Sequence, residues 1–459
     1  MADFLTSVMV SFRLFVAFLC ATLAAANSHS KPHAPTKWCT VKHNHDGADD
    51  TANILKAFKD CATDSIITFT ATNYSAYTPI TLAGLDNVII HLDGNLLLPN
   101  NLTKVQHEIN ITTNQPSTYA TPWFYFHGNN VELIGSADFE WGRFYGFGQH
   151  WWDLGVQTLR PQLATFNVTN GQIHSAGPSS PWLPLTTSHK VIKPVAWGWN
   201  LPGTNTRVEN HYVDAKPDNG SRWDSVSFPF NTDGINISGQ NITVDGYYGH
   251  NGDDCISVIN GARNVFATNG FCGFSSHGLS IGSLGKGGSV QTVQGVVFKN
   301  WTMDGAVYGA RFKSWTGGAG FADNVTWEDI TLVNVSTAIF VTQKYSLGPP
   351  PNVTSNSSTQ ISNFKYNNFK GGLNVNWTCI TPVCWNFVAG GDATQSIIFD
   401  LYPDTALNIS VGTMKVHPFE KPANATTVIC DPSTLALGEQ SILGFNCTRG
   451  PYVATPIVG

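Results

Sequence analysis

The feature that most constrains the fold is a set of short strand-like runs that recurs along the chain at roughly the length of one coil. β-branched and aromatic residues form these runs, and Gly, Asn and Asp residues separate them. Four runs begin at residues 241, 264, 295 and 324, at spacings of 23, 31 and 29 residues. A second set follows behind them, at 255–258, 279–281, 310–312 and 338–341. Two or more strands in each irregular coil are typical of a right-handed parallel β-helix. The alternative, a β-sandwich, would show stricter two-residue alternation and hairpin turns.

Composition agrees with an all-β chain and argues against two classes of partner. Only 12% of the 459 residues are charged and 43 are Gly, which favours a turn-rich β protein over a helical bundle. The net charge of −6 implies no broad basic surface, so we expect no nucleic-acid partner. Beyond the N-terminus no stretch approaches the ~20 apolar residues of a membrane-spanning helix, so we expect no membrane partner. We expect a monomer.

The N-terminus is typical of a secretory signal peptide. Arg13 precedes an apolar run over 14–23, and Ala24-Ala25-Ala26 offers a small-residue cleavage site. We therefore expect a signal peptide over 1–26, a single parallel β-helix domain over 27–459, and a secreted, extracellular protein. A signal anchor is the alternative. About 16 N-x-S/T sequons fit an exported chain, although many can remain unused.

Both ends of the stack of coils need a cap, because terminal coils expose apolar edges. After Asp49-Asp50-Thr51, the apolar residues Ile54, Leu55 and Phe58 predict a short capping helix that ends near Cys61. The segment from Ala389 is expected to cap the other end. Residues 175–219 show no strong periodicity, and we expect a long loop that walls a cleft. Core packing is the alternative for the tryptophans of this segment, Trp182, Trp197 and Trp199.

Eight cysteines remain once the expected signal peptide, with Cys20, is removed. An even number in an exported chain indicates disulfide bonds. Sequence alone does not fix their connectivity. We expect neighbours to pair because each pair then closes a short loop: Cys39–Cys61, Cys255–Cys272, Cys379–Cys384 and Cys430–Cys447. None of these spacings resembles a zinc site.

Four short motifs follow one another at about one per coil. They are Asn231-Thr232-Asp233-Gly234, Asn251-Gly252-Asp253-Asp254-Cys255, Ser276-His277-Gly278 and Arg311-Phe312-Lys313. Asp233 and Asp253 are 20 residues apart, and Asp254 and His277 are 23 apart, both close to one coil. Residues one coil apart in a parallel stack lie about 4.8 Å from each other. The motifs are therefore expected on one face. Each motif alone is common in turns or on solvated strands, but their shared order and spacing argue against coincidence.

The residue types in these motifs indicate glycoside hydrolysis next to an acidic sugar. Hydrolysis of a glycosidic bond uses one carboxyl group to protonate the leaving oxygen and another to activate water or attack the sugar. Crowded carboxylates repel one another, so at least one pKa should rise, and a proton is held for the general acid. Arg311 and Lys313 leave the same face of a strand and can bind a sugar carboxylate.

These residues resemble the polygalacturonase family of glycoside hydrolases, most specifically over 225–345. The resemblance implies a pectin-lyase-like right-handed parallel β-helix that hydrolyses α-1,4-galacturonosyl bonds with inversion, without metal or cofactor. It implies that Asp253 is the general acid, that Asp233 and Asp254 activate water, and that His277 supports the acid. The residues expected to bind the polygalacturonate substrate are Asn231, Gly278, Arg311, Lys313 and Tyr345.

The stretches 276–288 and 308–317 resemble fungal exopolygalacturonases, so we expect galacturonate to be released from chain ends. Phe312 and Ser314 stand where endo enzymes usually carry Ile and Thr, and Gly252 stands where many relatives carry Gln. The alternatives are an endopolygalacturonase and a hydrolase of xylogalacturonan or rhamnogalacturonan, although the last group lacks the histidine that His277 matches. A calcium-dependent pectate lyase and a non-catalytic glycan-binding β-helix belong to different functional classes.

Overall fold

The computed structural model describes residues 34–45, 47–112, 119–175, 189–218, 227–345, 357–374, 384, 387–391 and 395–458. The expected signal peptide lies outside these residues. Pro35–Gly459 forms one compact unit. Among the described residues, no helix combines the length and the apolar character needed to cross a bilayer.

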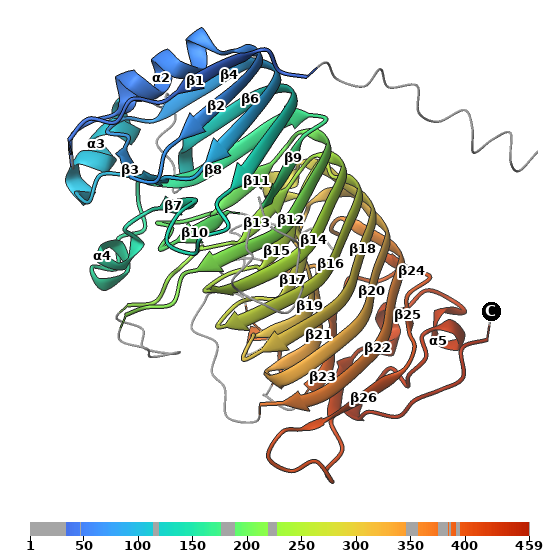
Figure 1. Cartoon of the computed structure of the whole chain (residues 1–459). Helices are drawn as coiled ribbons and strands as arrows, with labels where there is room; N and C mark the ends of the chain where they lie inside the picture. Colours follow the sequence, from blue (N-terminus) through green and yellow to red (C-terminus); the bar gives the residue numbers. More distant parts are fainter. Residues whose placement is uncertain are drawn as a thin grey trace, which may run out of the picture. The chain divides into compact units, whose positions relative to one another are not determined.

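Successive coils of this unit pair in parallel and form a right-handed parallel β-helix, as the sequence predicts (Figure 1). Long strands bend across two sides of most coils. They are β4 (Ile80–Leu92), β6 (Tyr119–Gly135), β12 (Thr204–Asp214), β14 (Gln240–Asn251), β16 (Arg263–Phe274), β18 (Val290–Asp304), β20 (Ala319–Val335) and β22 (Gln360–Leu373).

A column of mostly shorter strands forms the remaining side and is called the site column below. It consists of β8 (Arg160–Thr169), β11 (Trp199–Leu201), β13 (Ile235–Ile237), β15 (Ile256–Val258), β17 (Leu279–Leu284), β19 (Tyr308–Ser314), β21 (Thr337–Thr342), β23 (Gln395–Asp400) and β27 (Thr427–Cys430).

The other strands complete the first and last coils. They are β1 (Lys37–Thr40), β2 (Thr63–Phe69), β3 (Asn73–Ser75), β5 (Asn95–Leu97), β7 (Arg143–Tyr145), β9 (Gln172–Ser175), β10 (Lys190–Ile192), β24 (Ala406–Leu407), β25 (Ser410–Val411), β26 (Met414–Pro418) and β28 (Arg449–Pro451). Strand β28 pairs antiparallel with β27.

Inward side chains stack in columns along the axis of the coil. Phe298, Trp327 and Tyr366 occupy equivalent positions in successive coils and are fully buried. Their rings stack, with centroids 5.6 and 4.8 Å apart. Because each coil supplies one ring to the same column, the core is continuous from coil to coil.

Asparagines stand at the start of several strand-like runs for a conformational reason. Asn241 and Asn264 have φ of 56° and 54°, a left-handed conformation that Asn adopts more readily than most residues. Each side chain also donates a hydrogen bond to the equivalent asparagine of the preceding coil: Asn241 to Asn205 at 2.9 Å and Asn264 to Asn241 at 3.0 Å. The turns that separate the runs are thus linked along the stack.

Helices are few and short: α2 (Thr51–Asp60), α3 (Leu102–Thr112), α4 (Gly148–Asp153), α5 (Glu439–Ile442) and the 3₁₀ turns η2 (Lys286–Gly288) and η4 (Pro432–Thr434). Helix α2 is the predicted capping helix at the N-terminal end (Figure 1). It buries Ile54 and Phe58, but Leu55, expected on the same face, is 40% exposed. The segment from Ala389 closes the other end, where Leu443 and Phe445 are buried in the core.

The described part of the expected loop over 175–219, residues 189–218, differs from this prediction. They contribute three strands, β10, β11 and β12, to three sides of the coil. Trp199 lies on β11 and is 1% exposed, so the alternative interpretation of core packing is correct for this residue. Residues 176–188, with Trp182, lie outside the described residues.

Candidate active site

The candidate residues come from the turns that lead into the site column and from the strands that follow. The turns keep the backbone pairing of the strands. Gly234 N donates to Asp254 O at 2.9 Å, and His277 N donates to Asp253 O at 2.8 Å. The stacking that the motif spacing predicts is confirmed here, with one correction. Extension of the Ile235–Ile256 register places Asp233 level with Asp254, not with Asp253.

Asp253 and His277 form the first interacting pair of the site. His277 Nδ1 lies 2.9 Å from Asp253 Oδ1 and also 2.9 Å from Nη1 of Arg311. A guanidinium can only donate a hydrogen bond. An unprotonated Nδ1 has one lone pair, which accepts a hydrogen bond either from Arg311 or from a protonated Asp253, but not from both. When Nδ1 carries the proton, Asp253 accepts it as a carboxylate. The three residues thus link the protonation of Asp253 to the position of Arg311.

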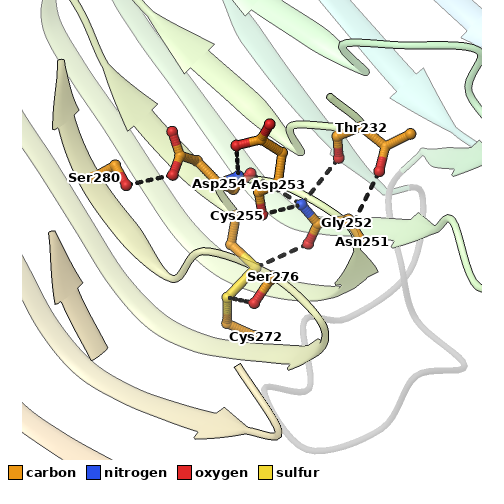
Figure 2. Close-up of a disulfide and its surroundings, with 9 residues drawn as sticks. All are labelled: Thr232, Asn251, Gly252, Asp253, Asp254, Cys255, Cys272, Ser276 and Ser280. Carbon is orange, nitrogen blue, oxygen red and sulfur yellow. Dashed lines mark hydrogen bonds between the residues drawn. A yellow bond between two sulfur atoms is a disulfide. The ribbon is translucent and has the colours of Figure 1, made fainter. Parts of the chain in front are cut away.

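Asp254 forms the second pair, with Lys313. Lys313 Nζ lies 2.6 Å from Asp254 Oδ2, and Arg311 Nη1 lies 3.7 Å from Asp254 Oδ1. Asp254 is fully buried, and the Ser280 hydroxyl also donates to its carboxylate. Figure 2 shows Ser280 beside Asp254 on the next strand of the column. The carboxyl group of Asp254 is therefore surrounded by two cations and one hydroxyl.

Asp233 lies in a different environment. It is 5% exposed, and its Oδ1 has no hydrogen-bond partner among the described residues. Burial, and then the charges of Asp253 and Asp254, raise the pKa of Asp233 well above its ordinary value. The expected rise in pKa is thus found at this carboxyl group, which becomes the one in the cluster that holds a proton most readily.

Asp253, the expected general acid, shifts the other way. Burial acts to raise its pKa, but His277 and the cations Lys313 and Arg311 outweigh burial and lower the pKa below its ordinary value. The prediction that the general acid has the raised pKa is therefore wrong for the site without substrate. The three carboxyl groups titrate as one cluster, and the cluster as a whole sets where a shared proton lies.

Both cations stay protonated in spite of complete burial. Burial acts to lower the pKa of Lys313, but Asp254 raises it beyond this loss, and the pKa of Arg311 is also raised. Tyr345 lies beside the two cations. Its ring centroid is 5.6 Å from Cζ of Arg311 and 5.8 Å from Nζ of Lys313. The structure thus brings the expected binding residues Arg311, Lys313 and Tyr345 together.

Asn231 lies on the opposite side of Asp253. Its Nδ2 donates to Asp253 Oδ2 at 2.9 Å, and its Oδ1 accepts from Arg160 at 2.7 Å. Each carboxylate oxygen of Asp253 therefore has a partner, Asn231 on Oδ2 and His277 on Oδ1.

Two glycines in the motifs are required by close packing. A Cβ at Gly278, which has φ of +69°, would lie 2.1 Å from the carbonyl oxygen of Tyr308. A Cβ at Gly252 would lie 2.4 Å from the carbonyl oxygen of Pro229. The 227–234 segment thus takes the space of a side chain at 252, which explains why glutamine is absent there.

Asp253, Asp254 and His277 also form the one cluster among the described residues whose potential metal ligands lie within 4.8 Å of one another. Asp254 already contacts Lys313 and Arg311. A metal ion bound at these atoms would lie against two positive charges. The geometry therefore fits proton transfer better than metal binding.

Three of the four expected disulfide bonds are present: Cys39–Cys61, Cys255–Cys272 and Cys430–Cys447. Cys379 lies outside the described residues, so the fourth pair stays a prediction. Cys255 directly follows Asp254, and its bond to Cys272 lies beneath the carboxylates (Figure 2). The disulfide therefore anchors the acidic turn to the adjacent strand β16.

Sequence reasoning gave no role to three residues that support the site. Asn251 Nδ2 lies within 2.8–3.0 Å of the carbonyl oxygens of Thr232, Asp253 and Asp254 and joins the two acidic turns. Ser280 could have been found from the two-residue alternation of β17, which places it level with Arg311. Arg160 is 71 residues from Asn231, and no local signal reveals this contact.

Comparison with known proteins adds independent information. A model of glycosyl hydrolases family 28 matches residues 197–391. A probable exopolygalacturonase C of Aspergillus flavus is 32% identical over 97% of this chain and 100% of its own length. A probable exopolygalacturonase C of Aspergillus niger is 32% identical over 95% of this chain and 97% of its own.

Solved structures share the fold. The endo-xylogalacturonan hydrolase of Aspergillus tubingensis superposes with a TM-score of 0.65 at 20% identity, over 90% of this chain and 99% of the other. A polygalacturonase of Erwinia carotovora gives 0.57 at 18% identity, over 85% and 96%. At these identities the likeness concerns the β-helix alone.

Proposed function

The chain belongs to glycosyl hydrolases family 28, and on this premise we propose that it is an exopolygalacturonase. It hydrolyses the α-1,4-galacturonosyl bonds of polygalacturonate and releases galacturonate from chain ends. The observation that carries this proposal is the convergence of three carboxyl groups, one histidine and two buried cations on a single face. The carboxyl groups supply acid and base catalysis, and the cations provide a site for the carboxylate that every unit of the substrate carries.

We propose the following roles. Asp253 protonates the leaving oxygen, and Asp233 and Asp254 activate the water that attacks the anomeric carbon. His277 holds and exchanges the proton of Asp253 through their 2.9 Å contact. Arg311, Lys313 and Tyr345 bind a galacturonate carboxylate and ring, and Asn231 and Gly278 border the same unit.

Substrate binding places the catalytic proton. Without substrate, the proton of the cluster is held by Asp233, because Arg311 and Lys313 favour the ionised form of Asp253. A galacturonate carboxylate that binds these cations offsets their charge. The pKa of Asp253 then rises and that of Asp233 falls relative to it. The proton thus passes from Asp233 to Asp253. The number of protons in the cluster stays the same, but Asp253 becomes the acid and Asp233 the base.

Acidic substrates activate the site through this mechanism, since a neutral sugar brings no further negative charge to Arg311 and Lys313. This accounts for a requirement for galacturonate at the position that contacts Arg311 and Lys313. It also explains why burial of two cations, which is costly by itself, is retained in this family member.

The test is a timed product profile on polygalacturonate, methylated pectin, xylogalacturonan and rhamnogalacturonan. Monogalacturonate as the first and sole early product supports the proposal. An early ladder of oligomers would indicate endo action, and release from a branched polymer in preference to polygalacturonate would indicate a different substrate.

We also propose that the chain is exported and acts as a monomer. Three disulfide bonds support export, and a candidate site assembled from one chain supports a monomer. N-terminal sequencing of protein from culture medium should begin at Asn27, and light scattering should give the mass of one chain.

A further inference from the structure

A cavity of about 460 Å³ lies away from the candidate active site, on strands of the first coils. Strands β3, β5 and β7 run parallel through it, with Asn73 level with Asn95 and Leu97 level with Tyr145. Its volume suits one or two sugar rings. The side chains that give it chemical character are Asn73, Asn95, Glu140, Trp141, Tyr145 and Phe147.

The lining of this cavity has the character of a carbohydrate site. Trp141, Tyr145 and Phe147 supply aromatic rings, and the rings of Tyr145 and Phe147 are 4.6 Å apart. Aromatic faces pack against the C–H faces of pyranoses, while amide and charged groups at the rim bind hydroxyl groups. Phe147 has φ of 55°, which is a strained conformation for a bulky residue. Such strain is concentrated at functional sites.

Asn73, which lines the cavity, starts an Asn73-Tyr74-Ser75 sequon. Its side chain is exposed, and its Oδ1 accepts a hydrogen bond from Nδ2 of Asn95 at 2.9 Å. Asn95 is 8% exposed and also donates to Glu140 O at 3.2 Å, so its amide is fixed. The contact orients the Asn73 amide so that its oxygen faces Asn95 and its nitrogen points away from Asn95. The nitrogen is the atom to which a glycan is attached.

Three other sequons, at Asn236, Asn241 and Asn300, lack this combination. The Nδ2 atoms of Asn241 and Asn300 donate to asparagines of the preceding coil at 2.9 and 2.7 Å. Asn236, which also begins a sequon, is 2% exposed. Asn73 combines an exposed side chain with a place in the lining of an aromatic cavity.

We propose that Asn73 carries an N-linked glycan whose first N-acetylglucosamine residues lie in this cavity against Trp141, Tyr145 and Phe147. The inference rests on the proposed export. A lipid-diphosphate-linked oligosaccharide is the donor. A bond forms between Nδ2 of Asn73 and C1 of the sugar, the C1–oxygen bond to the diphosphate breaks, Nδ2 loses one proton, and the lipid diphosphate leaves. The folded chain then closes over the attached sugar, and the glycan covers aromatic surface at the first coils.

The first experiment measures occupancy. The full chain is secreted from a yeast host, and each glycopeptide is quantified by mass spectrometry, with Asn424 as a matched sequon that is exposed but does not line the cavity. The Ser75→Ala variant removes the sequon and leaves Asn73 and the cavity intact, whereas Ser75→Thr preserves it. Occupancy at Asn73 in the wild type and Ser75→Thr supports the proposal. An unmodified Asn73 beside an occupied Asn424 would overturn it. Absence of a glycan from both sites of the secreted chain would also overturn it, whereas absence of the chain from the medium would show that the proposed export has failed.

The second experiment asks whether the glycan lies in the cavity. Native protein is treated with endoglycosidase H, and the loss of glycan is followed at Asn73 and Asn424. The Asn73 glycan should be released about fivefold more slowly, because a sugar packed on an aromatic ring must first detach. Trp141→Ala, or Tyr145→Leu if that variant does not fold, should abolish the difference, and Trp38→Ala, on β1 and 68% exposed, should not.

Equal release rates in the wild type would contradict a packed glycan. A third arm adds galacturonate oligosaccharides to the Ser75→Ala variant and monitors tryptophan fluorescence. Saturable quenching that Trp141→Ala removes would assign the cavity to free substrate and overturn the proposal.

Discussion

Lys313 Nζ lies 2.6 Å from the carboxylate of Asp254, and both side chains are buried, with 8% and 0% of their surface exposed. A buried pair of this kind is costly to break, because the partner that remains keeps its charge without compensation. We expect Lys313→Met to lower the free energy of unfolding by about 3–5 kcal/mol and to abolish activity. Urea denaturation followed by tryptophan fluorescence measures the first effect.

The double variant Lys313→Met/Asp254→Asn is the control for that experiment. It removes both charges, so most of the lost stability should return while activity stays absent. Equal stability of the single and double variants would show that the pair contributes through packing alone.

Two isosteric substitutions in the same site should change stability in opposite directions. The raised pKa of Asp233 contributes stability below about pH 3.8, the ordinary value, and this contribution is lost as pH rises through the folded-state pKa. Asp233→Asn should therefore stabilise the fold by roughly 1–3 kcal/mol at neutral pH, with no gain in strong acid. Thermal unfolding at several pH values tests this, and a neutral-pH loss would contradict the assignment.

Asp253→Asn is its matched counterpart. The pKa of Asp253 is lowered, so its contribution is present above the ordinary value and is lost as pH falls through the folded-state pKa. This variant should destabilise the fold at neutral pH by about 1–3 kcal/mol and converge with the wild type in acid. Turnover should fall by roughly 10²–10⁴, while the binding of oligogalacturonate measured by calorimetry should persist.

The pH dependence of catalysis should differ between free enzyme and complex. The pH profile of kcat/KM reports the free enzyme, and that of kcat reports the complex. If substrate raises the pKa of Asp253, the fall in rate at high pH that reports loss of the acid's proton should lie at higher pH for kcat than for kcat/KM. Initial rates on trigalacturonate, measured from about pH 3 to about pH 8, provide both profiles, because this range covers the titration of ordinary and raised carboxyl groups. Coincident limbs would indicate that bound substrate leaves the proton where it was.

For the stereochemistry of the reaction, the family resemblance and the carboxyl separation predict different outcomes. Potential ligand atoms of Asp253 and Asp254 lie within 4.8 Å of one another, and closely spaced carboxyl groups, about 5–5.5 Å apart, are typical of retaining enzymes. We nevertheless expect inversion, as the resemblance implies, so proton NMR should detect the β anomer first. An α anomer as first product would contradict the proposed roles of Asp233 and Asp254.

The disulfides offer a matched pair, because Cys255–Cys272 and Cys430–Cys447 both have a sequence separation of 17. Replacing either pair with alanine should cost about 2–4 kcal/mol of stability, since the closed loops are equally long. Only loss of Cys255–Cys272, which anchors the turn of Asp253 and Asp254, should reduce kcat. A similar kcat for both variants under folding conditions would show that the turn holds without it.

The coiled fold and most of the site can be predicted from the sequence, because residues that are one coil apart along the chain lie next to each other on the same face of the β-helix. The 23-residue separation of Asp254 and His277 identifies residues that are level in the structure. The 20-residue separation of Asp233 and Asp253 is one residue short of a level pair, because β13 and β15 pair with an offset of 21 residues. Strand β11 is also missed, since Trp199–Leu201 contains no β-branched residue, unlike the equally short β15.

Protonation could not be read from the sequence for a different reason. Crowding of carboxylates predicts that one pKa rises, but which one depends on where the cations lie. Arg311 contacts His277 beside Asp253, and Lys313 contacts Asp254, which leaves Asp233 with the least compensation. These distances join residues from separate coils, and no local pattern encodes them.

The backbone hydrogen bonds that continue from the strands through the acidic turns have an evolutionary consequence. The separation between neighbouring catalytic side chains is set by the spacing between paired strands, about 4.8 Å, which no loop alters. Insertions elsewhere in a coil can therefore reshape the walls of the cleft while the reaction geometry is inherited unchanged. Substrate range and cleavage mode can diverge along a lineage in this way without the chemistry being reinvented.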